Sequence, residues 1–108
     1  MSEKDLLKLI KKAILDKKGE KVEIIDVKAL TPFTNYYVIC SANNPRQIDA
    51  IKEAVVGELE LNKVKINHVE GKPNSGWVLI DAYQVIINVF SKSERERFNL
   101  TQFLTRKK

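Results

Sequence analysis

The sequence predicts an α/β (α+β) fold, in which helices pack on a mixed sheet of five strands. Apolar residues recur at helical spacing in separate segments, and short runs rich in β-branched residues lie between these segments. The resulting order is α-β-β-α-β-β-β-α. A chain of 108 residues has the usual size of one domain, so we expect residues 1–108 to share one core.

The chain up to residue 41 contains one predicted helix and two predicted strands. The helix extends from about residue 3 to 17, because its apolar positions share one face, and it ends near Gly19. Residues 21–27 are rich in β-branched residues and are typical of a strand. Residues 36–41 form a nearly continuous apolar run, which predicts a strand covered on both faces.

The middle of the chain begins with clear signals for a second helix. Asn44 is expected to cap this helix, with Pro45 at its first position and its end near Leu61. Residues 65–69 predict a third strand, and residues 70–76 have the composition of a loop.

The last part of the chain contains two more predicted strands and a final helix. The strands are residues 77–81 and 84–90, with a tight connection at Ala82 and Tyr83, and the helix is about residues 94–104, with Phe98 and Leu104 as inward anchors.

Charge and cysteine content give only weak functional information. The formal net charge of +5 suggests association with nucleic acid or a ribonucleoprotein, but a solvated basic face and a frayed tail would explain it equally well. The single cysteine, Cys40, cannot form an internal disulfide and is expected to be a buried strand residue. No apolar stretch approaches the roughly 20 residues needed to cross a bilayer, so we expect no membrane contact and a cytoplasmic location.

Motifs for catalysis are missing from the sequence. It contains no phosphate-binding loop, no dinucleotide fingerprint, no Cys-x-x-Cys pair and no Gly-x-Ser-x-Gly motif, and its only histidine is His68. Asp26, Glu70 and Asp81 lie at predicted strand ends or in loops, where carboxylates usually form turns and caps. We therefore expect no enzyme activity, no cofactor and no bound metal.

Three other features suggest a binding surface. Trp77 follows a polar loop, so it is either a core residue or an anchor for a protein partner. Glu70 and Asp81 bracket the strand that contains Trp77 and could place negative charge beside its indole. Arg95 and Arg97 could pair with acidic groups or phosphates, although mixed charge at helical spacing more often forms a solvated face.

Six short segments carry a pattern that extends over nearly the whole chain. They are residues 22–27, 33–41 followed by Arg46 and Gln47, 69–71, 77–81, 85–90 and 97–100. Each segment alone is a weak motif, but their order and spacing from about Leu6 to Leu104 are specific. Together they resemble the Iojap/RsfS family of ribosomal silencing factors, whose central signature is similar to residues 33–41.

The chain departs from the usual family pattern at several positions. Asn35 stands where the family usually has aspartate, Ala42 where it has glycine, and Asn88 where histidine is common. Residues 82–84 replace a stretch that usually contains Gly-Asp. Because Tyr83 tolerates a positive φ less well than glycine, we expect this turn to differ in geometry.

The resemblance implies a fold related to the nucleotidyltransferases without their catalytic carboxylates. It also implies binding to the large ribosomal subunit through its protein fourteen, which would block association with the small subunit and repress translation. Such a mechanism requires a rigid body at an interface and no catalysis. The expected partner-binding residues are Trp77, Glu70, Asp81, Tyr83, Arg95, Arg97 and Asn99.

Two other functions remain open from the sequence. One is a nucleotidyltransferase-fold enzyme, for which Ser41, Ala42 and Asn43 form the nearest approach to an active-site motif. The other is a basic RNA-binding domain, whose affinity for RNA would fall steeply with salt. Contact with rRNA, a homodimer and the regulating signal are also left open.

Overall fold

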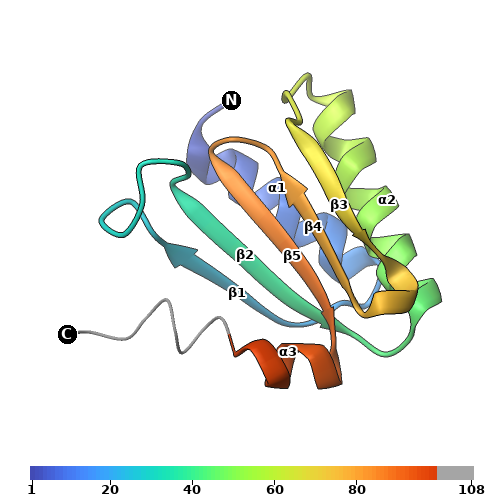
Figure 1. Ribbon diagram of the computed structural model, residues 1–108. Coiled ribbons are helices and arrows are strands. Elements are labelled where there is room, and N and C mark those ends of the chain that lie inside the picture. The colour runs from blue at the N-terminus through green and yellow to red at the C-terminus, as the bar shows by residue number, and fades with distance from the viewer. Residues whose placement is uncertain (100–108) are drawn as a thin grey trace.

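A computed structural model describes residues 1–99, which form three α-helices, one 3-10 helix and one five-stranded sheet (Figure 1). The arrangement confirms the predicted α/β (α+β) class and its order of elements. In chain order the elements are α1 (Glu3–Asp16), β1 (Glu20–Asp26), β2 (Tyr36–Ala42), α2 (Pro45–Leu61), β3 (His68–Lys72), η1 (Pro73–Ser75), β4 (Trp77–Asp81), β5 (Val85–Ser91) and α3 (Lys92–Phe98).

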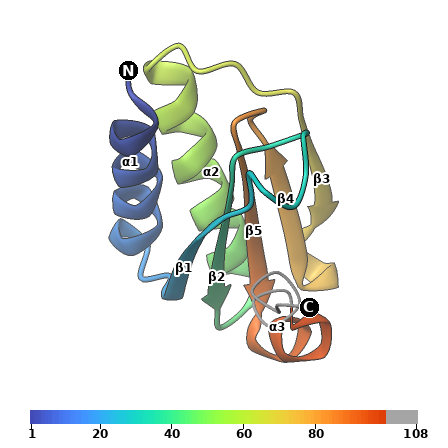
Figure 2. The ribbon, with the colours of Figure 1, turned by 90° about the vertical axis from the view of Figure 1, so that its left-hand side faces the viewer.

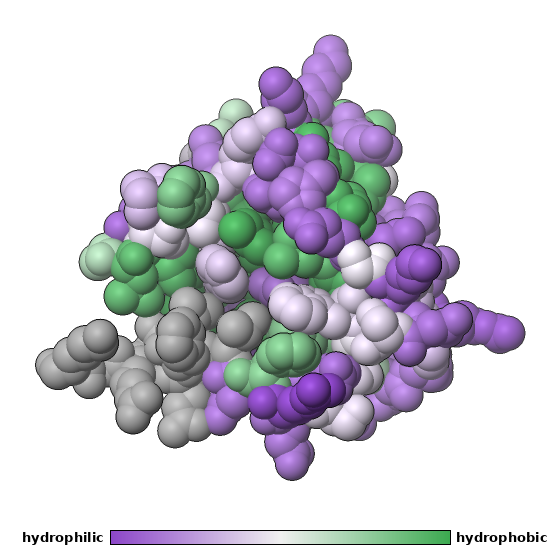
Figure 3. All heavy atoms as spheres, viewed as in Figure 1, coloured by the Kyte–Doolittle hydropathy of each residue, from purple (hydrophilic) through white to green (hydrophobic). Residues whose placement is uncertain are grey.

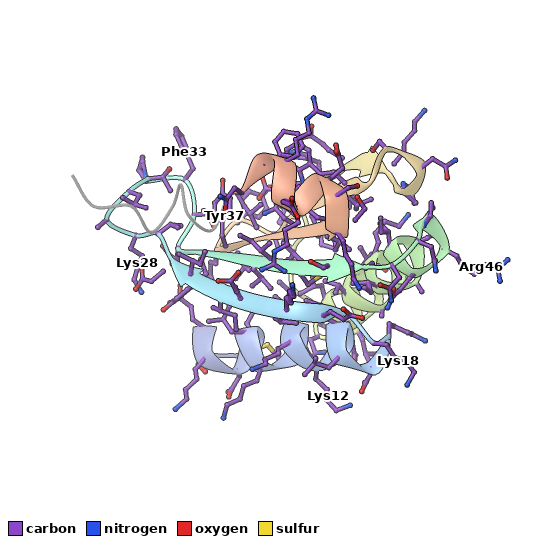
Figure 4. All side chains as sticks on the ribbon, turned by 90° about the horizontal axis from the view of Figure 1, so that it is seen from below. Lys12, Lys18, Lys28, Phe33, Tyr37 and Arg46 are labelled. Atoms are coloured by element: carbon purple, nitrogen blue, oxygen red, sulfur yellow. The ribbon has the colours of Figure 1, made fainter. Side chains whose placement is uncertain are left out.

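The sheet has the strand order β1-β2-β5-β4-β3. Its central strands, β2 and β5, are parallel, and the other neighbouring strands are antiparallel. Helices α1 and α2 lie side by side against one face of this sheet (Figures 1 and 2). Helix α3 lies at one end of the sheet and on the opposite side from α1 (Figure 4). Within residues 1–99, long helices therefore cover one face of the sheet only, and we call the other face the open face.

Both long helices begin at the capping residues that their sequences provide. The Ser2 side chain accepts a hydrogen bond from the Asp5 backbone N–H at 3.1 Å, and Asn44 caps α2 through the Gln47 N–H at 2.8 Å. Pro45 occupies the first position of α2, as predicted. Among residues 1–99, no helix is long and apolar enough to cross a membrane.

The core lies between these helices and the covered face of the sheet. Alternate residues of the three central strands point toward the helices, because side chains in a strand alternate between faces. The buried residues that meet there are Leu6, Ile10 and Ile14 of α1, Ile48, Ile51, Val55 and Leu59 of α2, and Val38, Cys40, Val78, Ile80, Ile87 and Val89 of the sheet.

The third strand begins three residues later than predicted. We expected it at residues 65–69, but β3 covers His68–Lys72 and takes in part of the predicted loop. All five of its residues are exposed, and among the described strands β3 pairs only with β4, at the edge of the sheet. An exposed edge strand has no apolar alternation to mark its bounds, which explains the error.

The final helix is shorter than predicted within the part of the chain that the structure describes. Helix α3 begins at Lys92, because the Ser91 hydroxyl accepts a hydrogen bond from the Glu94 N–H at 3.2 Å. Asn99 follows it in the left-handed region, with φ of 47°, which ends the helix. The predicted anchor Leu104 lies outside the described residues.

The turn between β4 and β5 differs from our expectation. Tyr83 itself takes a positive φ of 65°, the conformation that we expected a tyrosine to avoid. The Tyr83 N–H donates to the Asp81 carboxylate at 2.9 Å, and the Gln84 N–H donates to the Ala82 carbonyl at 2.8 Å. Local hydrogen bonds thus offset the strain that glycine would have removed.

Replacement of Gly71 by alanine should destabilise the β3–β4 hairpin. Gly71 has φ of +88°, and an added Cβ would lie 2.2 Å from the Trp77 carbonyl oxygen. We expect Gly71→Ala to lower the free energy of unfolding by about 1–3 kcal/mol in urea titrations. The matched control is Gly57→Ala in α2, where an added Cβ meets nothing within 4 Å, so stability should rise slightly. Equal stability of Gly71→Ala and the natural protein would contradict this account.

The thiol of Cys40 should be unreactive in the folded protein. Burial raises the pKa of Cys40 to about 12, although the nearby Arg95 opposes this shift. Since the thiolate is the reactive form, alkylation at pH 8 should be negligible until guanidinium unfolds the chain. The unfolded thiol ionises at a lower pH than the folded one, so this group should also reduce stability as pH rises above about 9. Fast labelling of the native protein would show that β2 opens readily.

Candidate partner-binding site

The centre of the candidate site is a cluster of three aromatic rings on the open face. The ring centroids of Trp77 and Phe90 lie 5.3 Å apart at an interplanar angle of 25°, and those of Trp77 and Phe98 lie 4.8 Å apart at 47°. Trp77 and Phe90 are paired across β4 and β5, whereas Phe98 approaches from α3. Phe90 is buried, but 41% of Phe98 remains exposed and Trp77 is half-buried. The cluster thus has a buried base and an accessible edge.

A buried amide fixes the orientation of the indole. The Trp77 Nε1–H donates to Asn88 Oδ1 at 3.0 Å, and Asn88 itself is wholly inaccessible to solvent. Asn88 pairs with Leu79 in the register of β4 and β5, two residues along from the Trp77–Phe90 pair and therefore on the same face. Among the described residues, its Nδ2 has no hydrogen-bond partner. The buried Asn88 therefore holds the polar edge of Trp77 toward the sheet, and the part of the ring that Phe90 and Phe98 do not cover stays accessible for contact.

Beside the indole lies a groove of about 280 Å³ between the β3–β4 hairpin and α3. The apolar part of its lining comes from Trp77, Leu79 and Phe98. Two carboxylates, those of Glu70 and Glu94, also line it, although the whole chain has a positive net charge. We call these five residues, together with Gly71 and Ser75 of the same lining, the Trp77 groove.

The groove has the composition of a site for a basic side chain. An apolar floor with an aromatic face can cover the aliphatic stem of lysine or arginine, and carboxylates at the rim can pair with its cationic end. Around this end of the open face, residues of high and intermediate hydropathy lie next to hydrophilic residues (Figure 3). The described residues contain no group of three or more His, Cys, Asp or Glu side chains that could hold a metal ion.

Glu70 lies in the groove, but its carboxylate also has a partner in the protein. It contacts Nε2 of His68, which is on the same face of β3. His68 Nδ1 lies 3.8 Å from the Asp81 carboxylate, so the histidine stands between two acidic groups. About two thirds of the Glu70 side chain is exposed, which leaves it accessible to a partner.

Asp81 and Tyr83, which we predicted in the same site, lie at the other end of β4. Asp81 does not line the Trp77 groove. Its carboxylate accepts hydrogen bonds from the Tyr83 backbone and, at 3.3 Å, from the Asn67 amide. The Tyr83 hydroxyl donates to Asn67 Oδ1 at 3.2 Å. These two residues therefore organise the turn that leads into β5.

Arg95 is engaged inside the protein. Its guanidinium contacts the Glu23 carboxylate and donates to Ser41 Oγ at 3.0 Å, and only 14% of the side chain is exposed. It also donates to the Lys21 carbonyl. Arg95 thereby ties α3 to β1 and β2. Ser41, which the enzyme alternative would place in an active site, is part of this structural contact.

Arg97 and Asn99 complete the set of predicted site residues. Arg97 is largely exposed, lies 3.7 Å from the Glu94 carboxylate and has its guanidinium carbon 5.7 Å from the Phe98 ring centroid. It is therefore at the border of the Trp77 groove and can reach a partner. Asn99 ends α3, and its N–H donates to the Arg95 carbonyl at 2.8 Å.

The sequence did not identify Asn88 or Glu94 as site residues. Asn88 was noted only as a departure from a common histidine, and its position beneath the indole follows from the register of β4 and β5. Glu94 enters the groove because α3 begins early and crosses the end of the sheet. Alternation along β5 could have placed Asn88 and Phe90 on one face, but not opposite Trp77.

Comparison with known proteins gives consistent results along the whole chain. The family model described as "Ribosomal silencing factor during starvation" matches residues 1–108. The ribosomal silencing factor RsfS of Bacillus subtilis is 31% identical over 100 residues, which cover 93% of this chain and 85% of that protein. The chloroplastic protein Iojap of Zea mays is 32% identical over 94 residues, covering 85% of this chain and 40% of that protein.

Solved structures of similar proteins have the same fold. A crystal structure of a Chromobacterium violaceum protein superimposes with a TM-score of 0.93 and 27% identity, covering 100% of this chain and 90% of that chain. A Bacillus halodurans protein gives a TM-score of 0.84 and 32% identity, covering 94% of each chain. With the full-length family match and the curated relatives, these findings show that the chain belongs to the family of ribosomal silencing factors, RsfS and Iojap.

Proposed function

We propose that the protein binds the large ribosomal subunit through its protein fourteen and blocks association with the small subunit. The observation that supports this proposal most strongly is the Trp77 groove, on a face that no long helix of residues 1–99 covers. A half-buried tryptophan with an ordered polar edge is the type of residue that anchors protein interfaces. The family name describes a silencing factor, which is a regulatory role.

The charge of the groove fits a ribosomal protein as the partner. Ribosomal proteins are generally basic, and an acidic rim would steer and orient a basic surface. Glu70 and Glu94 supply this rim beside Trp77. Arg97, at its border, is a candidate contact for an acidic group of the partner or for neighbouring rRNA.

The other expected site residues would act at different distances from the partner. Asp81 and Tyr83 would extend the contact surface along β4 toward the turn. Arg95 and Asn99 would act mainly by positioning α3, through the Glu23 contact and through the helix end.

The proposed mechanism requires occupancy of a surface and no chemical step. A rigid domain that covers part of the intersubunit surface excludes the small subunit sterically. Because its partner is the ribosome, we propose that the protein acts in the cytoplasm.

Truncation of Trp77 tests the anchor role directly. Trp77→Ala should weaken binding to isolated ribosomal protein fourteen by at least about 30-fold, the effect of losing a hot-spot side chain worth about 2 kcal/mol. Calorimetric titration of the two purified proteins measures this change. Leu61→Ala is the matched control, because Leu61 is 77% exposed but belongs to α2, behind the sheet. Equal affinity of folded Trp77→Ala and the natural protein would eliminate the anchor role.

Replacement of Asn88 tests whether the orientation of the indole matters. Asn88→Leu keeps the side-chain size and removes the acceptor for Trp77 Nε1, together with the buried Nδ2 that lacks a partner. Trp77, the only tryptophan of the chain, then loses a fixed partner, so the tryptophan fluorescence of the variant should shift. The affinity of the variant for the ribosomal protein should fall about tenfold. Asn88→Asp, which keeps the acceptor, should retain more of the affinity than Asn88→Leu. The positioning role fails if Asn88→Leu shifts the fluorescence but leaves binding unchanged.

A further inference from the structure

The most exposed large hydrophobic residue in the described part of the chain is Phe33. It lies in the loop between β1 and β2, and 86% of its surface is accessible. Leu30 of the same loop is 58% exposed. Single exposed apolar residues are common, but an aromatic and a leucine together on one loop form a candidate contact surface.

The loop that carries Phe33 is held by backbone hydrogen bonds. The Val27 N–H donates to the Asn35 carbonyl at 2.9 Å, and the Asn35 N–H donates to the Gln84 carbonyl at 3.0 Å. Thr34, next to Phe33, is buried. Because the backbone is already ordered on both sides of Phe33, a partner would not have to order it, and this lowers the entropic cost of binding.

Phe33 points toward the same side of the sheet as the Trp77 groove. Figure 4 shows its side chain directed to the side where α3 lies, whereas Lys12 of α1 is on the opposite side. Tyr37 of β2 is half-buried and lies between the loop and the centre of the open face (Figure 4). Hydrophobic surface is visible both near the centre of the face and at this loop (Figure 3).

The groove alone is too small to hold a protein partner. A stable protein interface usually involves about 20–30 residues from each side, and seven of the described residues line the groove. The partner must therefore extend beyond it across the face. On one side of the groove lies the edge strand β3, with exposed residues such as His68 and Lys72. On the other side, the open face continues over β5 and β2 to the loop that carries Phe33.

We propose that the Phe33 loop, residues 27–35 with Phe33 and Leu30 as contacts, is a second anchor for the same ribosomal protein that occupies the Trp77 groove. This inference rests on the proposed function and extends it to a two-point interface. The two anchors lie at opposite ends of the open face, on a molecule that measures 35 × 34 × 21 Å. One protein surface that covers the face would meet both, and two separated anchors would fix its orientation.

The test measures the affinity of Phe33→Ala for isolated ribosomal protein fourteen by calorimetry. We expect a loss of about tenfold, and Phe33→Asp should lose more because it places a charge in an apolar contact. Neither substitution should unfold the protein, since Phe33 is mostly exposed, and unchanged urea midpoints would verify this. Leu61→Ala is again the control. The double variant Phe33→Ala with Trp77→Ala should show the product of the two single losses, because the anchors do not touch.

Several results would overturn the inference. Unchanged affinity of Phe33→Ala, while Trp77→Ala still weakens binding, would show that the groove acts without the loop. A loss seen only with whole large subunits would assign Phe33 to rRNA or another component. Conversion of a dimer to a monomer by Phe33→Ala in sedimentation would assign it to a second copy. If the natural protein itself does not bind the ribosomal protein, the proposed function fails first and the inference falls with it.

Discussion

The contact between Arg95 and the first two strands holds the candidate site together. Helix α3 has seven residues, too few to be stable alone, so its position depends on tertiary contacts. Arg95 reaches from it to the Glu23 carboxylate and the Ser41 hydroxyl, which lie on neighbouring strands β1 and β2. Because the guanidinium is largely buried, loss of its partner would leave a poorly solvated charge. With α3 fixed in this way, Phe98 packs on Trp77 and Glu94 forms one side of the groove.

A second constraint is the one-sided covering of the sheet. Two long helices bury one face in the core, and of the described helices only the short α3 crosses the end of the other face. The open face therefore carries residues that serve different purposes from those of the core: an aromatic cluster, a buried amide beneath it and carboxylates around it. Such a face suits recognition of another protein by shape and charge. A mechanism that blocks subunit joining also needs a rigid surface that stays bound to its partner, and it needs no chemical step.

Much of the fold could be predicted because its elements have strong local signals. Apolar spacing marked α1 and α2, and Asn44 and Pro45 marked the start of α2. A β-branched run marked β1, and a continuous apolar run marked β2. The edge strand β3 was misplaced because its pairing with β4, and not an apolar pattern, sets its bounds. Trp77 and Glu70 were predicted together and do share a groove, whereas Asp81 belongs to a turn. The Arg95–Glu23 contact joins residues 72 positions apart, so no local pattern could have predicted it.

In the proposed function, this domain binds the large ribosomal subunit and thereby prevents the two subunits from joining. Sucrose-gradient sedimentation of isolated subunits, mixed at a magnesium concentration that favours joining, measures this most directly when the purified protein is added before mixing. We expect the protein to travel with the large subunit, and the peak of joined ribosomes to fall as free subunits accumulate. Protein that stays at the top of the gradient, or travels with the large subunit while joining proceeds normally, would contradict it.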